Sequence, residues 1–529
     1  MGSNYAKGMY QQLSEQIELG ERLQAENKAL RIENRILKDE VSSLRTKITE
    51  METTMADKIS ACVAEAVKQA TEPLMTELSK AHTEISRLKS IINKDSSNSS
   101  MPPSSNGFKV IPNSREKSGK PQGGQKGHPG HRLQLPKNIE ELEKQGKIER
   151  RVADHTNGST KFVSKYVIDV EMKVVITEHR FFKGKVPTNF NNEVSYGNGI
   201  KAHTMLLMNE GIVAYKRLSN IISGMTAGII RLSTGTMNEF QHDFARRLTE
   251  TGELEAIKQD LLNGEVLNTD DTSMRVLEKI IYPEDDAPNE PILYERGEKK
   301  SLRATIRTHS NEKSTFYTVN PQKDQKGIER DRILPLYMGI LSHDHESKFF
   351  NYGKANAACG SHLTRNLKGL SDSFHCPWAA QMRSFVLSMN DHKNNDIKAG
   401  MNSCTHEQLE SFEAEYDRMV NQGLQALTQM KKKTWEYDEF NAILNRLANS
   451  KDSYMLFIRD YKVPFTNNLA ERDLRSEKLK EKVSGLFRSW NGIVTHSKVR
   501  SFLSTAKKRS KDLYFSILQV MEGIPVLAS

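Results

Sequence analysis

The chain has 529 residues, enough for several hydrophobic cores, so its length predicts a multidomain protein. Lys and Arg number 77 against 67 Asp and Glu, which gives a net charge of +10 and a pI near 9.1. This excess suits an acidic polymer as partner, although proteins that never bind nucleic acid reach it too. The four cysteines lie far apart without a Cys-x-x-Cys pair, so the sequence supports neither a disulfide framework nor a zinc ribbon.

The sequence shows no targeting or membrane-spanning segment. Its first residues have no apolar core of signal-peptide length, and no run reaches the ~18 apolar residues of a membrane span. We therefore expect a soluble, cytoplasmic protein that does not bind a membrane.

Residues 1–93 carry the heptad pattern of a coiled coil. The d positions are Leu23, Leu30, Leu37, Leu44 and Met51, and the a positions are Asn27, Asn34, Val41, Ile48 and Met55. Asn at a buried a position favours a dimer of two helices in register, because its best hydrogen-bond partner is the same Asn of the other helix. At the flanks, Glu26, Glu33 and Glu40 would face Arg31, Lys38 and Arg45 of a parallel partner. The pattern predicts a parallel homodimer. A weaker heptad follows a break near Pro73, at Leu74, Leu78, Ala81, Ile85, Leu88 and Ile92.

Residues 94–135 are rich in Ser, Pro, Gly and Lys and have no apolar period, which predicts a flexible linker. The linker is basic, and Lys126 and Arg132 are candidate phosphate contacts. An inert solvated tether is nearly as good an interpretation.

Two small regions should follow the linker. Residues 136–190 are expected to form a β domain, because one face of KYVIDVEMKVVIT is apolar at period two: Tyr166, Ile168, Val170, Met172, Val174 and Ile176. Residues 191–258 turn helical, with a Gly-containing turn and an N-cap at Ser233 or Thr234. This layout fits a DNA-binding helix-turn-helix and an ordinary helical hairpin equally well.

The second half of the chain predicts an α/β core in two parts, residues 259–370 and 461–529, around a helical insertion at 371–460. A strand leads from Val266 to Asp270, a second covers Met274 to Leu277, and a third lies in STFYTVNP. A short buried strand ends at Asp344. A charged helix opens at Asn467 and Asn468, and one final helix covers residues 496–518.

Three acidic residues in this core are candidate metal ligands. Asp270 and Asp344 follow short β-type runs, and Glu471 lies early in a later helix. Carboxylates at strand ends suit a hard cation such as Mg²⁺, which keeps some of its waters and phosphate oxygens. Two such ions can stabilise the attacking and leaving oxygens of a phosphoryl displacement. Three acids alone prove little, since most are surface solvators.

A basic stripe surrounds Glu471. It consists of Arg472, Arg475, Lys478, Lys480, Lys482 and Arg488. Phosphate contacts supply most of the affinity of a protein for duplex DNA, so these residues are candidate DNA contacts. The interleaved Asp473, Glu477 and Glu481 favour instead an exposed helix of mixed charge.

The segments LNTDDTSMRVL, LSHDHESKFFNY with AACGSHLTRNLKGL, and NNLAERDLRSEKLKEKVSGLFRS occur in this order. They resemble the three catalytic blocks of the insertion-sequence-sixty-six transposases, and the zipper and linker resemble that family's N-terminal region. The resemblance implies an RNase H-like α/β core, a mixed β-sheet flanked by helices, with a triad at Asp270, Asp344 and Glu471.

The sequence departs from this family in one place and varies in another. Family members commonly carry a cysteine-rich zinc module after the linker, but residues 136–190 contain no Cys. Asp271 stands where the family usually has a Glu, beside the ligand, so an Asp271→Asn variant should retain activity. Cys359 and His362 match the family's Cys-x-x-His block, and a buried helix-packing pair is the favoured interpretation of them.

The resemblance implies a DNA transposase that uses two Mg²⁺ or Mn²⁺ ions per active site. It would cleave a phosphodiester at the transposon end, and the released 3′-hydroxyl would attack target DNA. Its partners would be double-stranded DNA (terminal inverted repeats and target), a second copy of the chain and, where the element needs them, accessory proteins. A catalytically inactive dimeric repressor and a metal-dependent nuclease without strand transfer are the alternatives.

Overall fold

A computed structural model of the chain describes residues 60–93, 134–281 except 159, 183 and 191, 293–296 and 302–528, together with positions 26, 33, 35–43, 45, 46, 95 and 98. The described residues form two compact units. The first comprises Met1–Phe108, Ser342–Glu346 and Ala355–Asn467, and the second Lys109–Leu341, Ser347–Lys354 and Asn468–Ser529. The proposed linker residues Lys126 and Arg132 lie outside the described part of the chain.

The central element is a mixed five-stranded sheet flanked by helices, with the strand order β5-β4-β1-β6-β7. Its strands are β1 (Val266–Val276), β4 (Leu302–Ser310), β5 (Thr315–Asn320), β6 (Ile340–His343) and β7 (Ala355–Ala358). β1 pairs antiparallel with β4, which pairs antiparallel with β5. A separate two-stranded sheet joins β2 (Glu278–Ile281) to β3 (Leu293–Arg296).

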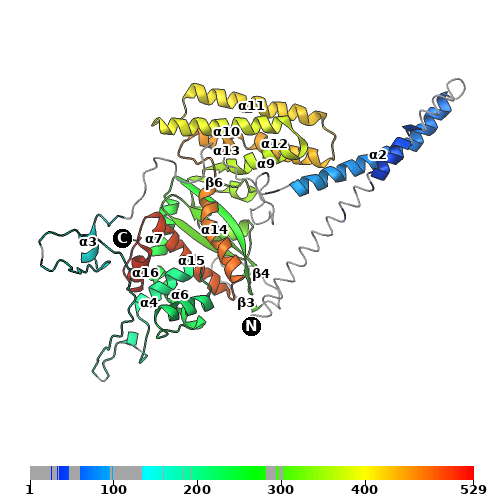
Figure 1. Ribbon diagram of the computed structural model, residues 1–529. Coiled ribbons are helices and arrows are strands. Elements are labelled where there is room, and N and C mark those ends of the chain that lie inside the picture. The colour runs from blue at the N-terminus through cyan, green and yellow to red at the C-terminus, as the bar shows by residue number, and fades with distance from the viewer. Residues whose placement is uncertain are drawn as a thin grey trace. The chain divides into compact units, whose positions relative to one another are not determined.

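The helices of the second unit come from segments before, between and after the strands in the sequence (Figure 1). They are α4 (Asn198–Asn209), α5 (Tyr215–Met225), α6 (Thr234–Glu250), α7 (Glu253–Leu262), α8 (Gln325–Asp331), α14 (Asn468–Ser484), α15 (Trp490–Lys508) and α16 (Leu513–Met521), with a short α3 (Ile139–Lys144) before them. One buried core joins α4, α6, α15 and α16 through Met205, Phe244, Phe502 and Ile517.

α15 also completes the hydrogen bonding of the edge strand β5. The backbone N–H groups of Thr315 and Tyr317 donate to the hydroxyls of Thr505 (3.0 Å) and Ser501 (2.9 Å). An unpaired strand edge is a site of aggregation unless it is covered, and these two hydroxyls cover it.

The secondary structure of the described residues of the first unit is helical apart from β7 and the end of β6. Its helices are α2 (Ser60–Asn93), α9 (Gly360–Phe374), α10 (Pro377–Lys398), α11 (His406–Gln429), α12 (Trp435–Asn449) and α13 (Lys451–Arg459). Trp378 anchors the core: its indole N–H donates to the Met419 carbonyl (2.7 Å) and its ring lies 4.9 Å from that of Phe440. α2 packs against α9 and α12.

Several predicted elements agree with the structure, and others differ. Ser233 is the N-cap of α6, since its hydroxyl accepts the N–H of Thr236 at 3.0 Å. β1 is one continuous strand, and α2 runs through Pro73 without the expected break. The expected final helix is two helices, because Ser510 has a φ of 53° and Asp512 caps α16.

The β domain expected at 136–190 differs most. Among the described residues of this range the structure has α3 and a 3-10 turn but no strand. Side chains of the expected apolar face are exposed, for example Tyr166 (67 %), Val170 (85 %) and Ile176 (88 %). Period-two alternation predicts a strand only where a partner strand and a core exist to receive the apolar face, and the described residues of this range have neither.

Among the described helices, none combines the length and the apolar character needed to cross a membrane.

Candidate functional site

Asp270 lies in the middle of β1, in the second unit. It is directly opposite Thr308 of β4 in the antiparallel register, and its side chain is half-buried. One of its carboxylate oxygens accepts the backbone N–H of Asp271 at 2.8 Å. Because side chains alternate along a strand, Asp270 and Asp271 point to opposite faces of the sheet. The two acids therefore have different surroundings.

Asp271 belongs to a buried group of charges. In the β1–β4 register it stands opposite Arg307, and both side chains are 1 % exposed, with 3.5 Å between their charged atoms. Its carboxylate also contacts the ammonium groups of Lys348 (2.7 Å) and Lys323 (3.0 Å). Arg307 pairs in addition with the buried Asp331. Asp271 therefore contacts three cationic side chains, and its replacement should disturb this group of charges.

Glu471 lies in the first turn of α14, which packs against β1 and β4. The buried face of this helix carries Ala470, Leu474 and Glu477. Asp473 also points inward, since its carboxylate accepts hydrogen bonds from Ser310 (2.7 Å), Thr315 (2.8 Å) and Lys508 (2.8 Å). These contacts fix the rotation of α14 on the sheet.

A buried ion-pair network holds α14 against α15. Glu477 accepts from His496 Nε2 at 2.9 Å and lies 3.5 Å from Arg500. Burial acts to raise the pKa of Glu477, but His496 and Arg500 outweigh it, so the pKa is lowered and the carboxylate is ionised. Arg500 donates to the Asn209 carbonyl (3.1 Å) and to Glu210 (2.8 Å), which extends the network to the end of α4.

Because Asp473 and Glu477 turn inward, the exposed residues after the first turn of α14 are basic or apolar. The exposed positions between residues 471 and 484 are Arg472, Arg475, Lys478, Leu479, Lys482 and Val483. Arg488, after the helix, is exposed as well. At 3.6 residues per turn, Lys478 and Lys482 lie within about 20° of the helical direction of Glu471. Apart from Lys480, the basic residues of the predicted stripe are exposed, whereas Asp473 and Glu477 are turned away from that surface.

Lys480 is the exception within that stripe. It is half-buried, and its ammonium lies 5.9 Å from the centre of the Tyr215 ring. Burial lowers the pKa of Lys480. This lysine therefore serves packing between α14 and α5.

Asp344, the remaining predicted ligand, belongs to the first unit and follows β6 directly. Its carboxylate accepts from Asn467 Nδ2 (3.2 Å) and lies 3.2 Å from His362 Nδ1. Burial lowers the pKa of His362, but hydrogen bonds with Asp344 and Cys359 outweigh it and raise the pKa to about 10. Asp344, Cys359 and His362 each offer a ligand atom, and these atoms lie within 4.8 Å of one another.

The surroundings of Asp344 are fixed by backbone contacts. The N–H of Asn467 donates to Cys359 Sγ (3.2 Å), and the N–H of Cys359 donates to the His343 carbonyl (2.9 Å). Cys359, His362 and Asn467 were not predicted as site residues. The Cys-x-x-His spacing in the sequence, which lies at the start of α9, is the signal that could have identified Cys359 and His362.

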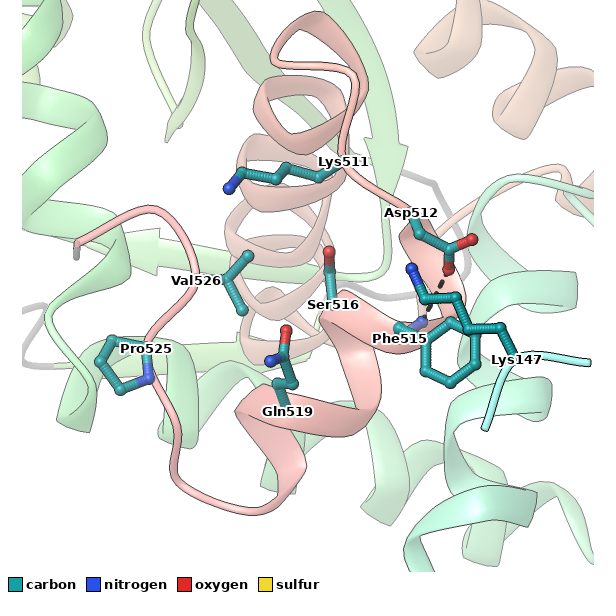
Figure 2. Close-up of a pocket in the computed structure, with 8 residues that line it drawn as sticks. All are labelled: Lys147, Lys511, Asp512, Phe515, Ser516, Gln519, Pro525 and Val526. Atoms are coloured by element: carbon teal, nitrogen blue, oxygen red, sulfur yellow. Dashed lines mark hydrogen bonds between the residues drawn. The ribbon is translucent and has the colours of Figure 1, made fainter. Parts of the chain in front are cut away.

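One cavity near the C-terminus contains none of the predicted site residues. It has a volume of about 240 Å³ and lies between Lys147 and the C-terminal segment around α16. Figure 2 shows Asp512 accepting the N–H of Phe515 at its rim, with Lys147 over the Phe515 ring, 5.0 Å from its centre. We assign no function to this cavity.

Two family models match different parts of the chain. The sequence profile described as "Transposase IS66 family" matches residues 193–495, which is more than half of the chain. A second profile, a family of unknown function, matches residues 11–134. No curated protein is a significant match to the chain.

Among solved structures, the chain has a remote likeness to two complexes of Mos1 transposase. One is the paired-end complex with the left transposon end, at 13 % identity and a TM-score of 0.12, covering 53 % of this chain and 83 % of the other. The other is the strand transfer complex, at 12 % identity and a TM-score of 0.11, covering 53 % and 82 %. Superpositions with TM-scores this low carry no argument about the fold.

Proposed function

This chain belongs to the IS66 transposase family, and from that premise we propose that it cuts DNA at transposon ends and joins the released 3′-hydroxyl to target DNA. We propose further that its core is RNase H-like and that Asp270, Asp344 and Glu471 form the catalytic triad. The helices α10–α13 would then be the insertion that precedes the glutamate.

The proposed triad fits Mg²⁺ or Mn²⁺ by its donor chemistry, since each member offers carboxylate oxygens. Two such ions would stabilise the charge that develops on the phosphodiester oxygens during displacement. Asp270, Asp344 and Glu471 would hold the ions. Cys359 and His362 offer sulfur and nitrogen, which Mg²⁺ does not favour, so we assign them no part in holding it.

The observation that best supports a DNA substrate is the outer face of α14. Arg475, Lys478 and Lys482 are exposed and follow Glu471 by four, seven and eleven residues. At 1.5 Å per residue they extend about 6, 10 and 16 Å along the helix from the acid, a length suited to several phosphates of one strand. A DNA backbone held by these side chains would pass Glu471. Arg472 and Arg488 would add contacts at its edges.

Removing two of these charges should weaken DNA binding without changing sequence preference. We expect Arg475→Ala with Lys482→Ala to lower affinity for matched and random duplexes alike. The slope of log affinity against log salt should flatten by about one unit for each phosphate that the variant no longer neutralises. Cleavage should slow too, since a displaced backbone is no longer in line for attack. The measurement is a salt titration of binding with DNA that flanks the gene and with random duplex.

Lys480→Ala is the control for this titration, because it removes one positive charge from the inward face of the same helix. It should keep the slope of the wild-type protein. Equal slopes for the double variant and the wild type would contradict the proposal. DNA contact would then belong elsewhere, as expected of a repressor that binds through the helices between residues 195 and 250.

We propose that the chain dimerises through its N-terminal coiled coil. Of the heptad positions, the structure describes Leu37 and Val41 in a helical segment, and both are less exposed than their described neighbours. Replacing Leu30 and Leu37 with Pro should interrupt both helices at the seam. Light scattering should then report a monomer or a weaker dimer, whereas an unchanged dimer would place the interface elsewhere.

A further inference from the structure

A second group of potential metal ligands lies in the first unit, in the turn between α10 and α11. His392 and Asp396 are four residues apart on α10, so they project from the same face of the helix. Gly400, with a φ of 83°, takes the left-handed conformation that ends α10 and reverses the chain. The returning segment brings Cys404 back to His392, one residue before Thr405 caps α11.

The three side chains converge on one point. His392 Nε2 lies 3.3 Å from an Asp396 carboxylate oxygen and 3.9 Å from Cys404 Sγ. All three potential ligand atoms lie within 4.8 Å of one another. Tetrahedral zinc with ordinary bond lengths requires about 3.3 Å between nitrogen and oxygen ligands and about 3.6 Å between nitrogen and sulfur ligands. The separations are therefore close to those of a zinc site.

Neighbouring residues hold two of these side chains in place. Tyr461 donates its hydroxyl to the same Asp396 oxygen, and the Asp396 side chain is only 10 % exposed. The Phe412 ring, on α11, meets the His392 ring edge to face at 5.2 Å. Ligands of bound metals are commonly oriented by such outer contacts. His392 remains 32 % exposed, so solvent reaches the group from one side.

We propose that His392, Asp396 and Cys404 bind one Zn²⁺, with water as the fourth ligand. The ion would tie the C-terminal turn of α10 to the residue that precedes α11 and so fasten the α10–α11 hairpin. A thiolate and an imidazole favour zinc over Mg²⁺, which separates this site from the carboxylates assigned to catalysis. The proposal does not depend on the proposed transposase activity.

Zinc content of the purified full-length chain tests this site. After loading with Zn²⁺ and removal of loosely bound metal, Cys404→Ser should retain about one equivalent less than the wild type. His392→Gln should show the same loss, which guards against an effect peculiar to one variant. Cys376→Ser is the matched control, since Cys376 is a half-buried cysteine at the start of α10 and outside the group. It should retain the wild-type amount.

Cobalt substitution supplies a second readout that separates this site from Cys359 and His362. In a Cys359→Ser protein loaded with Co²⁺, we expect the near-ultraviolet band of thiolate–cobalt charge transfer, and Cys404→Ser should remove it. The same zinc content in the wild type and in both site variants would overturn the proposal. So would a cobalt band that persists without Cys404.

Discussion

Replacing Asp270 or Asp344 with Asn, or Glu471 with Gln, should abolish DNA cleavage and leave DNA binding intact. Each change removes one charged oxygen donor from the proposed metal ligands and keeps the shape of the side chain. We expect cleavage to fall on the order of 10³-fold or more, because groups that act as one catalytic unit fail together. Binding should persist, since the proposed phosphate contacts on the outer face of α14 would supply the affinity. Cleavage and binding would be measured on the same labelled duplex.

Glu481→Gln is the matched control for the third carboxylate. It removes an acid from the same helix, one that is half-buried beside Arg275 at 3.8 Å and lies outside the triad. It should retain cleavage. Strong cleavage by any triad variant would remove that residue from the site, and a parallel loss of binding and thermal stability would mean misfolding.

Asp271→Asn should destabilise the second unit and also slow cleavage, contrary to the expectation drawn from the sequence. The change leaves Arg307, which is 1 % exposed, and Lys348 without the anion that both contact. Removing one partner of a buried ion pair costs about 3 kcal/mol, and Asp331 still pairs with Arg307, so we expect about that loss in the free energy of unfolding. Asn keeps the backbone N–H that the Asp270 carboxylate accepts, so cleavage should fall because the weakened pairing with Arg307 disturbs β1, which carries Asp270. Chemical denaturation and the cleavage assay report the two effects.

Lys323→Ala serves as the control for this group of charges. Lys323 contacts the same carboxylate at 3.0 Å but is 49 % exposed, so its loss should cost no more than about 1 kcal/mol. If Asp271→Asn unfolded at the same denaturant concentration as the wild type, the buried pairing with Arg307 would contribute nothing to stability.

Local patterns predicted much of the catalytic half. The apolar runs before Asp344 and in STFYTVNP became β6 and β5, and the Ser233 cap lies where its residue type suggests. β4 was missed, although Leu302, Ala304 and Ile306 have the period-two spacing of a strand; the pattern is short, and it ends at Arg307, which faces Asp271 in the register. Periodicity in the sequence describes one face of one strand, whereas the pairing of Asp271 with Arg307 depends on two strands lying side by side.

The charge pattern of α14 could not be resolved from the sequence for a similar reason. In the sequence, Asp473 and Glu477 interrupt the basic stripe. In the structure, each contacts residues of other elements: Asp473 binds Ser310 and Lys508, and Glu477 binds His496. Arg472, Arg475 and Lys482, which the sequence identified as members of a basic stripe, are exposed in the structure. Which face turned outward was decided by tertiary contacts.

The central claim, that this member of the IS66 family joins DNA strands, is tested most directly by a strand-joining reaction. Full-length protein would be mixed with a labelled duplex from the DNA that flanks the gene, ending in a 3′-hydroxyl, and with an unlabelled plasmid. With Mg²⁺ or Mn²⁺ the label should become covalently attached to the plasmid. Chelation, or Glu471→Gln, should prevent this. Cleavage without any joined product would instead indicate a nuclease, and specific binding without either product would indicate a repressor.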